Sequence, residues 1–248
     1  MNRPIIITGS SRGIGAATAL LAGQRGYSVC VNYKADSESA QHVVDAIAST
    51  GGQAIAMQAD VADESEVKRL FDACATAFGP PVALVNNAGI LETQMRLESM
   101  GADRLQRIFS TNVIGPLLCC REAVRRMSTR RGGAGGAIVN LSSVAARLGA
   151  PGEYVDYAAS KGAVDTMTIG LAKELAEDGI RVNAVRAGYI HTDMHASGGE
   201  PGRVDRLKDG IPLKRGGQPE EVARAVLWLL SDEASYTTGS FLDVAGGR

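Results

Sequence analysis

The 248-residue sequence has little that would direct it to a membrane or to a nucleic acid. No apolar run approaches the roughly 18 residues that a membrane-spanning helix needs, and the run near the start, Ile5–Thr8, is too short for a signal peptide. A formal net charge of −1 offers no basic surface for nucleic acid or for an anionic membrane. We therefore expect a soluble, cytoplasmic protein that binds neither.

Cysteine and histidine are also scarce, with four and three residues respectively. Cys30, Cys74, Cys119 and Cys120 form no C-x-x-C pair with a matching histidine cluster, so no zinc site is expected. Free, buried thiols in a reducing compartment are the better interpretation.

Short apolar runs alternate with longer helical patterns along the whole chain. The runs lie at residues 4–8, 27–32, 53–60, 82–89, 136–143, 180–188 and 240–247. Most are rich in Val and Ile and lack strict alternation, which is typical of strands buried on both faces. The order predicts an α/β fold with a doubly wound parallel sheet, helices on both faces, and one domain over residues 1–248.

Three local signals mark helix boundaries. Residues 16–26 form a helical pattern that Gly26 stops. Asp63 and Glu66 have the spacing of a capping box. Pro219 suits the first turn of a further helix.

The segment IIITGSSRGIGAAT joins the first strand to a helix through a glycine-rich turn. Glycines let the backbone approach a ligand closely, and a helix N-terminus attracts phosphate. A dinucleotide pyrophosphate is therefore expected here. The predicted cofactor-binding residues of this turn are Gly9, Ser11, Arg12, Gly13, Ile14 and Gly15.

The end of the second strand bears on the choice between NAD and NADP. An acid there would bind the ribose 2′-hydroxyl of NAD, but this chain has Asn32, Tyr33 and Lys34, which we predict to be cofactor-binding residues. Arg12 and Lys34 are available to neutralise a 2′-phosphate. NADP is therefore favoured, and NAD remains open.

Four motifs in order carry a family resemblance: TGSSRGIG, NNAG at 86–89, a Ser-Ser pair at 142–143 and YAASK at 157–161. Together they resemble the classical short-chain dehydrogenase/reductase family, over the whole chain, and in particular its branch of sugar dehydrogenases and β-ketoacyl-carrier-protein reductases. The resemblance implies a Rossmann-like fold, hydride transfer between NADP(H) and a small-molecule carbonyl or alcohol, and a homotetramer. The helix ARAVLWLL and the C-terminal strand are a plausible contact surface for that tetramer.

The resemblance also implies roles for individual residues. Asn112 would hold a water in a proton relay. The further cofactor-binding positions that it implies are Asp60, Val61, Asn87, Ala88, Gly89, Gly188, Ile190 and Thr192.

Two tyrosines compete for the role of acid/base. Tyr157 precedes Lys161 by four positions, as in the classical family, whereas Tyr154 precedes it by seven, which resembles the divergent enoyl reductases. The glycine turn and the strand-end serine favour Tyr157, and Tyr154 follows Pro151 and Gly152 at the ragged start of a helix. We expect the Lys161 ammonium to lower the pKa of Tyr157 and to hold the cofactor's ribose.

Ser143 is the expected donor to the substrate oxygen. Side chains alternate along a strand, so only one serine of the pair faces the cofactor. Ser143 lies 14 residues before Tyr157, close to the family's spacing, and Ser142 is expected to support the turn.

The substrate is left open by the sequence. Residues 191–217 are polar and contain glycine, and they are expected to form a mobile lid. Small ketones, sugars, polyols and acyl thioesters all remain candidates. Two alternatives stay beside the leading hypothesis: an enoyl reductase that uses Tyr154, and a non-catalytic NADP-binding sensor.

Overall fold

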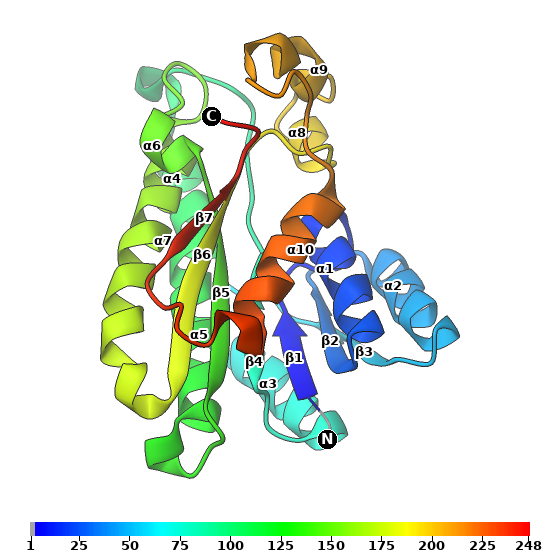
Figure 1. The fold of residues 1–248 in the computed structure, drawn as a ribbon. Helices are drawn as coiled ribbons and strands as arrows, with labels where there is room; N and C mark the ends of the chain where they lie inside the picture. The colour runs from blue at the N-terminus through cyan, green and yellow to red at the C-terminus, as the bar shows by residue number, and fades with distance from the viewer. Residues whose placement is uncertain (1–2) are drawn as a thin grey trace.

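A computed structural model describes residues 3–248 and contains one seven-stranded sheet. All strand pairings are parallel, in the order β3-β2-β1-β4-β5-β6-β7 (Figure 1). The strands are β1 (Arg3–Ile7), β2 (Tyr27–Tyr33), β3 (Gln53–Gln58), β4 (Ala83–Asn86), β5 (Gly136–Ser143), β6 (Ile180–Ala187) and β7 (Phe241–Val244). Every strand overlaps one of the seven predicted apolar runs. The predicted parallel α/β fold is therefore confirmed.

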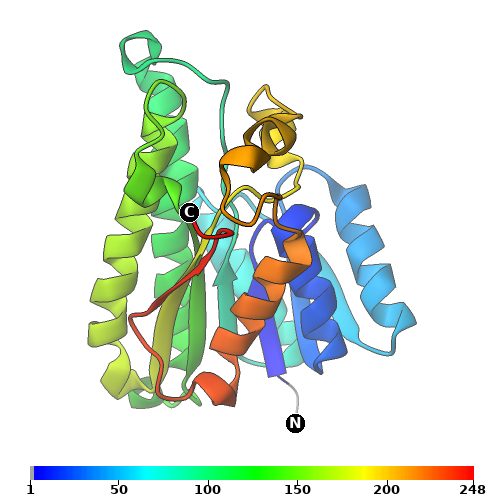
Figure 2. The same cartoon turned by 45° about the horizontal axis from the view of Figure 1, so that its top comes forward.

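Helices cover both faces of this sheet (Figures 1 and 2). One face carries α1 (Gly13–Gln24), α2 (Ser37–Ser49) and α10 (Pro219–Leu230), and the other carries α3 (Glu64–Phe78), α5 (Gly115–Met127) and α7 (Val155–Glu174). Within β1, Ile5 and Ile7 pack in the core on the face covered by α1, α2 and α10. Ile6 packs in the core on the opposite face. Both faces of the strand are buried, which explains the continuous apolar run in the sequence.

Shorter helices complete the connections. They are α4 (Ala102–Phe109), α6 (Ala145–Leu148), α8 (Met194–Ser197) and α9 (Arg203–Leu207), with a π-helical turn at Ser110–Ile114. Single 3-10 turns lie at Leu97–Ser99, Thr129–Arg131, Ala176–Asp178, Lys208–Gly210 and Asp232–Ala234.

One predicted helix start and one predicted capping contact need correction. Helix α1 begins at Gly13 instead of at residue 16, so half of the glycine turn already belongs to the helix. The Asp63 carboxylate accepts a hydrogen bond from Glu66 N at 3.0 Å, as a capping box requires. The Glu66 carboxylate instead accepts from Asp60 N at 2.6 Å, and Asp63 N donates to Asp60 O at 3.0 Å. Pro219 opens α10, as predicted.

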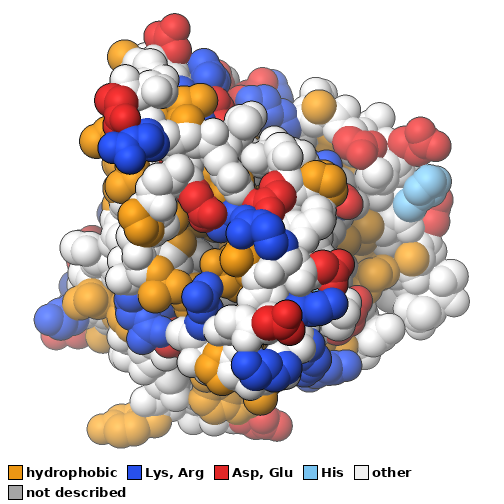
Figure 3. Space-filling model, turned by 90° about the horizontal axis from the view of Figure 1, so that it is seen from above, with side chains coloured by type: hydrophobic (Ala, Val, Ile, Leu, Met, Phe, Trp, Pro, Cys, Tyr) orange, Lys and Arg blue, Asp and Glu red, His pale blue; other side chains and the backbone are white. Residues whose placement is uncertain are grey.

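The carboxyl ends of the strands share one edge of the sheet, and α8 and α9 lie beyond that edge (Figure 1). Seen from that side, acidic and basic side chains are intermingled (Figure 3). All four cysteines are free and buried, as predicted. No helix among residues 3–248 is long and apolar enough to cross a membrane.

Candidate active site

The glycine turn after β1 has no room for a side chain at Gly9 or at Gly15. Gly9 has φ +60°, and a Cβ there would lie 2.9 Å from Ala88 Cα. A Cβ at Gly15 would lie 2.4 Å from Gly9 O and 2.5 Å from Asn87 Nδ2. The first turn of α1 leaves backbone N–H groups unsatisfied. This close-packed turn at a helix N-terminus fits the diphosphate of a dinucleotide.

Two asparagine side chains, one buried and one partly buried, hydrogen-bond to the backbone of the turn. Asn32, 1% exposed, accepts from Gly9 N at 3.0 Å and donates to Ala59 O at 3.0 Å. Asn87 Nδ2 donates to the carbonyls of Thr8 and Gly9 at 2.8 Å each. The polar atoms of Asn32 are thus engaged by backbone, which makes this predicted cofactor residue a support for the turn. Thr8 Oγ1 accepts from Asn87 N and Ala88 N at 3.0 Å each, a role that the sequence analysis did not assign although Thr8 begins the TGSSRGIG motif.

The charged groups near the end of β2 are largely paired. Lys34 Nζ lies 2.7 Å from Asp60 Oδ2, so two predicted cofactor residues neutralise one another. Asp36 caps α2 by accepting from Ser39 N at 2.9 Å. Arg12, at the N-cap of α1, is exposed. Val61 is 4% exposed and packs against Gly115.

A cavity of about 150 Å³ gathers residues from three strand ends and α7. It brings the predicted residues Ser143, Tyr157 and Lys161 together, as the sequence analysis expected. Five further predicted residues line it: Ile14, Asn87, Gly188, Ile190 and Thr192.

The paired serines at the end of β5 diverge. Ser143 Oγ accepts from Ala145 N at 3.1 Å and donates to Ala187 O at 3.3 Å. Ser142 Oγ instead donates to Asp165 Oδ1 at 2.6 Å. Burial raises the pKa of Tyr157 to about 12, and a hydrogen bond with the Ser143 side chain opposes that rise.

Lys161 lies beneath Tyr157 and is itself buried. Its Nζ donates to Leu141 O at 2.7 Å and lies 5.6 Å from the centre of the Tyr157 ring. Burial lowers the pKa of Lys161 to about 8, opposed by the Asp165 carboxylate. The net pKa of Tyr157 is raised because the desolvation of the phenol dominates, and the lowering effect of the Lys161 ammonium stays a prediction.

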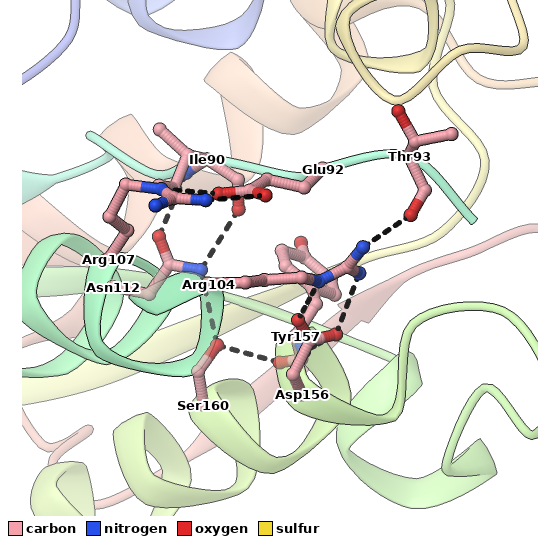
Figure 4. A network of polar contacts seen from close by, with 9 residues as sticks. All are labelled: Ile90, Glu92, Thr93, Arg104, Arg107, Asn112, Asp156, Tyr157 and Ser160. Atoms are coloured by element: carbon pink, nitrogen blue, oxygen red, sulfur yellow. Dashed lines mark hydrogen bonds and ion pairs between the residues drawn. The ribbon is translucent and has the colours of Figure 1, made fainter. Parts of the chain in front are cut away.

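Asn112 occupies the π-helical turn and is fully buried. Its Oδ1 accepts from Ile90 N at 2.8 Å, and its Nδ2 donates to Ile90 O at 3.0 Å and to Ser160 Oγ at 3.2 Å (Figure 4). A Cβ at Gly89 would lie 3.4 Å from Asn112 Oδ1 and 3.7 Å from Lys161 Nζ. The amide thus holds the loop after β4 beside Lys161, and its contact with a water stays a prediction.

Tyr154 contacts the segment that contains α8 through a hydrogen bond. It is the N-cap residue of α7, is 2% exposed, and donates from its hydroxyl to Gly198 O at 3.3 Å. The Arg203 guanidinium lies 5.0 Å from the centre of its ring. Tyr154 lines the same cavity as Tyr157, but its hydroxyl is engaged elsewhere.

Ion pairs that the sequence did not indicate lie at the part of the cavity wall that Glu153 and Arg203 form. Arg203 is 5% exposed and pairs with Glu153 at 2.5 Å and with Glu200 at 3.0 Å. Gln94 Nε2 donates to Glu200 at 2.5 Å, which connects this cluster to the loop after β4. Among residues 3–248, no group of three or more His, Cys, Asp or Glu is placed to hold a metal ion.

The parallel sheet, the glycine turn and the Ser143, Tyr157 and Lys161 cluster define a nicotinamide-dependent oxidoreductase. A family model described as enoyl-(acyl carrier protein) reductase matches residues 9–248. An uncharacterized oxidoreductase of Escherichia coli K12, YgfF, is 62% identical over 98% of both chains. The 3beta-hydroxysteroid dehydrogenase 1 of Eggerthella lenta is 41% identical over 99% of this chain and 93% of that one.

A solved structure of a Serratia marcescens short-chain dehydrogenase/reductase variant superimposes with a TM-score of 0.90. It is 33% identical and covers 99% of this chain and 97% of its own. The chain belongs to the short-chain dehydrogenase/reductase family.

Proposed function

We propose that the chain is an NADP(H)-dependent carbonyl reductase, reversible as an alcohol dehydrogenase, whose substrates carry apolar groups beside the reacting carbon. The observation that carries the proposal is the meeting of Ser143, Tyr157 and Lys161 at one cavity. The cavity walls include the apolar side chains of Leu91, Val144, Leu148 and Met194. Such walls favour a ketone or an acyl thioester over a sugar or polyol, which would leave its hydroxyls without partners.

When bound, the nicotinamide supplies or accepts the hydride. The chain's own residues act on the oxygen: Tyr157 donates the proton that the new alkoxide needs, and Ser143 hydrogen-bonds that oxygen as its charge develops. A pKa of about 12 keeps the Tyr157 proton in place at neutral pH, which suits the reductive direction. Lys161 would hold the cofactor's ribose.

NADP is proposed over NAD because no free carboxylate stands where the ribose 2′-hydroxyl of NAD would be bound. Asp60 is paired with Lys34, and Asp36 is engaged as a helix cap. Arg12 is exposed at the start of α1 and is the charge best placed for a 2′-phosphate. Arg12→Ala should raise the KM for NADPH about tenfold, the loss of one charge-assisted hydrogen bond, without changing the KM for NADH. Arg25→Ala, at the other end of α1, is the matched control, and equal effects on both cofactors would contradict the proposal.

The enoyl reductase alternative is favoured by the description of the matching family model and by the position of Tyr154. Against it, the Tyr154 hydroxyl is engaged by Gly198 O. The test is a screen of NADPH and NADH against apolar ketones, acyl thioesters, sugars and enoyl thioesters, with Tyr154→Phe alongside wild type. Ketone reduction that survives Tyr154→Phe supports the proposal. Turnover of enoyl thioesters alone, or tight NADPH binding without any turnover, would instead identify an enoyl reductase or a sensor.

We also propose one domain over residues 1–248, in which residues 191–217 form a lid (the lid segment), and a cytoplasmic homotetramer. The contact surface proposed for the tetramer includes α10 and β7, where Trp228 is 38% exposed and Leu242 is 37% exposed. Apolar side chains exposed on neighbouring elements favour burial against another copy. Light scattering at micromolar concentration tests this, and a monomeric mass would refute it.

A further inference from the structure

A buried ion pair lies behind the candidate active site, between α4 and the start of α7. The Arg104 Nε lies 2.7 Å from Asp156 Oδ2, and Nη2 donates to Asp156 Oδ1 at 3.3 Å (Figure 4). The two side chains are 5% and 0% exposed. A bidentate contact of this kind fixes orientation as well as charge.

Each residue of the pair also hydrogen-bonds to a backbone group of the candidate active site. Asp156 Oδ1 accepts from the backbone N of Tyr157 at 2.9 Å, in the first turn of α7. Arg104 Nη1 donates to Thr93 O at 2.5 Å, in the loop after β4. That loop supplies Leu91 to the cavity wall and Gln94 to the Glu200 contact. The pair therefore connects the residue that bears the reactive phenol to the loop that borders the substrate.

We infer that Arg104 and Asp156 are positioning residues for the reaction: the pair fixes the first turn of α7, and with it Tyr157, against the loop that forms one wall of the substrate cavity. This inference rests on the proposed function for its kinetic readout, but not for its structural one. Neither residue touches the cavity.

Stability alone does not explain this pair. Two charges taken out of water recover their desolvation cost only with good geometry, and an apolar pair of similar volume often serves stability equally well. This pair uses its remaining hydrogen-bonding capacity on two backbone groups, Tyr157 N and Thr93 O, that belong to the site. A displacement of about 1 Å at such a group can cost about 100-fold in rate.

The chain contains a control pair that starts from the same helix, α4. Arg107, one turn further along α4, pairs with Glu92 of the same loop at 2.9 Å. Its side chain is 58% exposed, and its Nε and Nη2 both donate to that carboxylate. A general effect of the ion pairs made by α4 would appear in both pairs, whereas a positioning effect on Tyr157 belongs to Arg104 and Asp156 alone.

The test is the double substitution Arg104→Met with Asp156→Asn, which leaves no unpaired buried charge and keeps an acceptor for Tyr157 N. We expect kcat for ketone reduction to fall about tenfold to 100-fold, the primary deuterium isotope effect on kcat to rise, and the Kd for NADPH to stay unchanged. A merely structural role would lower the active fraction without changing the isotope effect. Arg104→Lys should restore part of kcat, and Arg107→Met with Glu92→Gln should match wild type.

Hydrogen exchange gives a readout that does not depend on activity. Backbone amides of residues 91–95 and 155–160 should exchange faster in the double variant, while those of α10 stay unchanged. If wild type reduces no carbonyl, the proposed function fails and the exchange result still decides this inference. Unchanged kcat, isotope effect and exchange would overturn it. If the double variant does not fold, Arg104→Lys decides, and wild-type values for it would overturn the inference as well.

Discussion

The glycine turn (residues 9–15) and the lid segment (residues 191–217) are held in place by different means. The turn is built from backbone and from small residues in contact, and a Cβ at Gly15 would collide with Gly9 O. The lid segment is held by side-chain contacts, chiefly the ion pair of Arg203 with Glu153 and the hydrogen bond from Gln94 to Glu200. The comparison indicates that the proposed cofactor site tolerates no added atoms at Gly9 or Gly15, whereas the proposed lid can be altered by exchanging pairs of side chains.

The largest effect is expected in the turn itself. Gly15→Ala would place a methyl group 2.4 Å from Gly9 O and 2.5 Å from Asn87 Nδ2, so the turn must open. We expect the Kd for NADPH to rise at least about 100-fold, or about 2.7 kcal/mol, measured by cofactor fluorescence. Gly170→Ala is the control, because nothing lies within 4 Å of its Cβ in the middle of α7. That substitution should stabilise the protein by up to about 1 kcal/mol, and equal loss of binding in both would contradict the comparison.

The next largest effect is expected in the pH dependence of ketone reduction, which reports on Lys161. Burial lowers the pKa of Lys161 to about 8, so its ammonium is present below that pH and lost above it. We expect kcat/KM for ketone reduction to be level near neutral pH and to fall about tenfold per pH unit above 8. The profile is measured with NADPH at low ketone concentration. A level profile through pH 9.5 would show that the Lys161 charge is not needed or that its pKa is not lowered.

The smallest effect is expected in the lid segment. Arg203→Met removes both ion pairs while keeping an apolar side chain under Tyr154. The KM for the ketone should rise about fivefold to tenfold, or about 1 kcal/mol, with the Kd for NADPH unchanged. Lys208→Ala, which removes an exposed pair with Asp205, serves as the control. A change in cofactor binding of the same size would mean that the proposed cofactor site and the lid segment are not independent.

The parts that the sequence predicts are those with local signals. The seven apolar runs became the seven strands, because burial on both faces leaves continuous Val and Ile. The spacing of Tyr157 and Lys161 placed both at one cavity, and strand alternation separated Ser143 from Ser142. In each case the relevant contacts lie within a single element or at adjacent strand ends.

The parts that were not predicted depend on distance in the sequence or on desolvation. Arg104 and Asp156 are separated by 52 positions and have no motif to link them. The Glu66 carboxylate accepts from Asp60 N instead of from Asp63 N, a contact that depends on the conformation of the loop before α3. The pKa of Tyr157 rose instead of falling because burial of the phenol outweighs its neighbours.

The most direct test of the account is single-turnover oxidation of NADPH bound to Tyr157→Phe, with wild type beside it. The account predicts that the variant binds NADPH as tightly as wild type. Its hydride transfer to a ketone should be slower by about 100-fold to 10,000-fold, because the proton donor is gone. An unchanged single-turnover rate in the presence of bound NADPH would contradict the assignment of Tyr157.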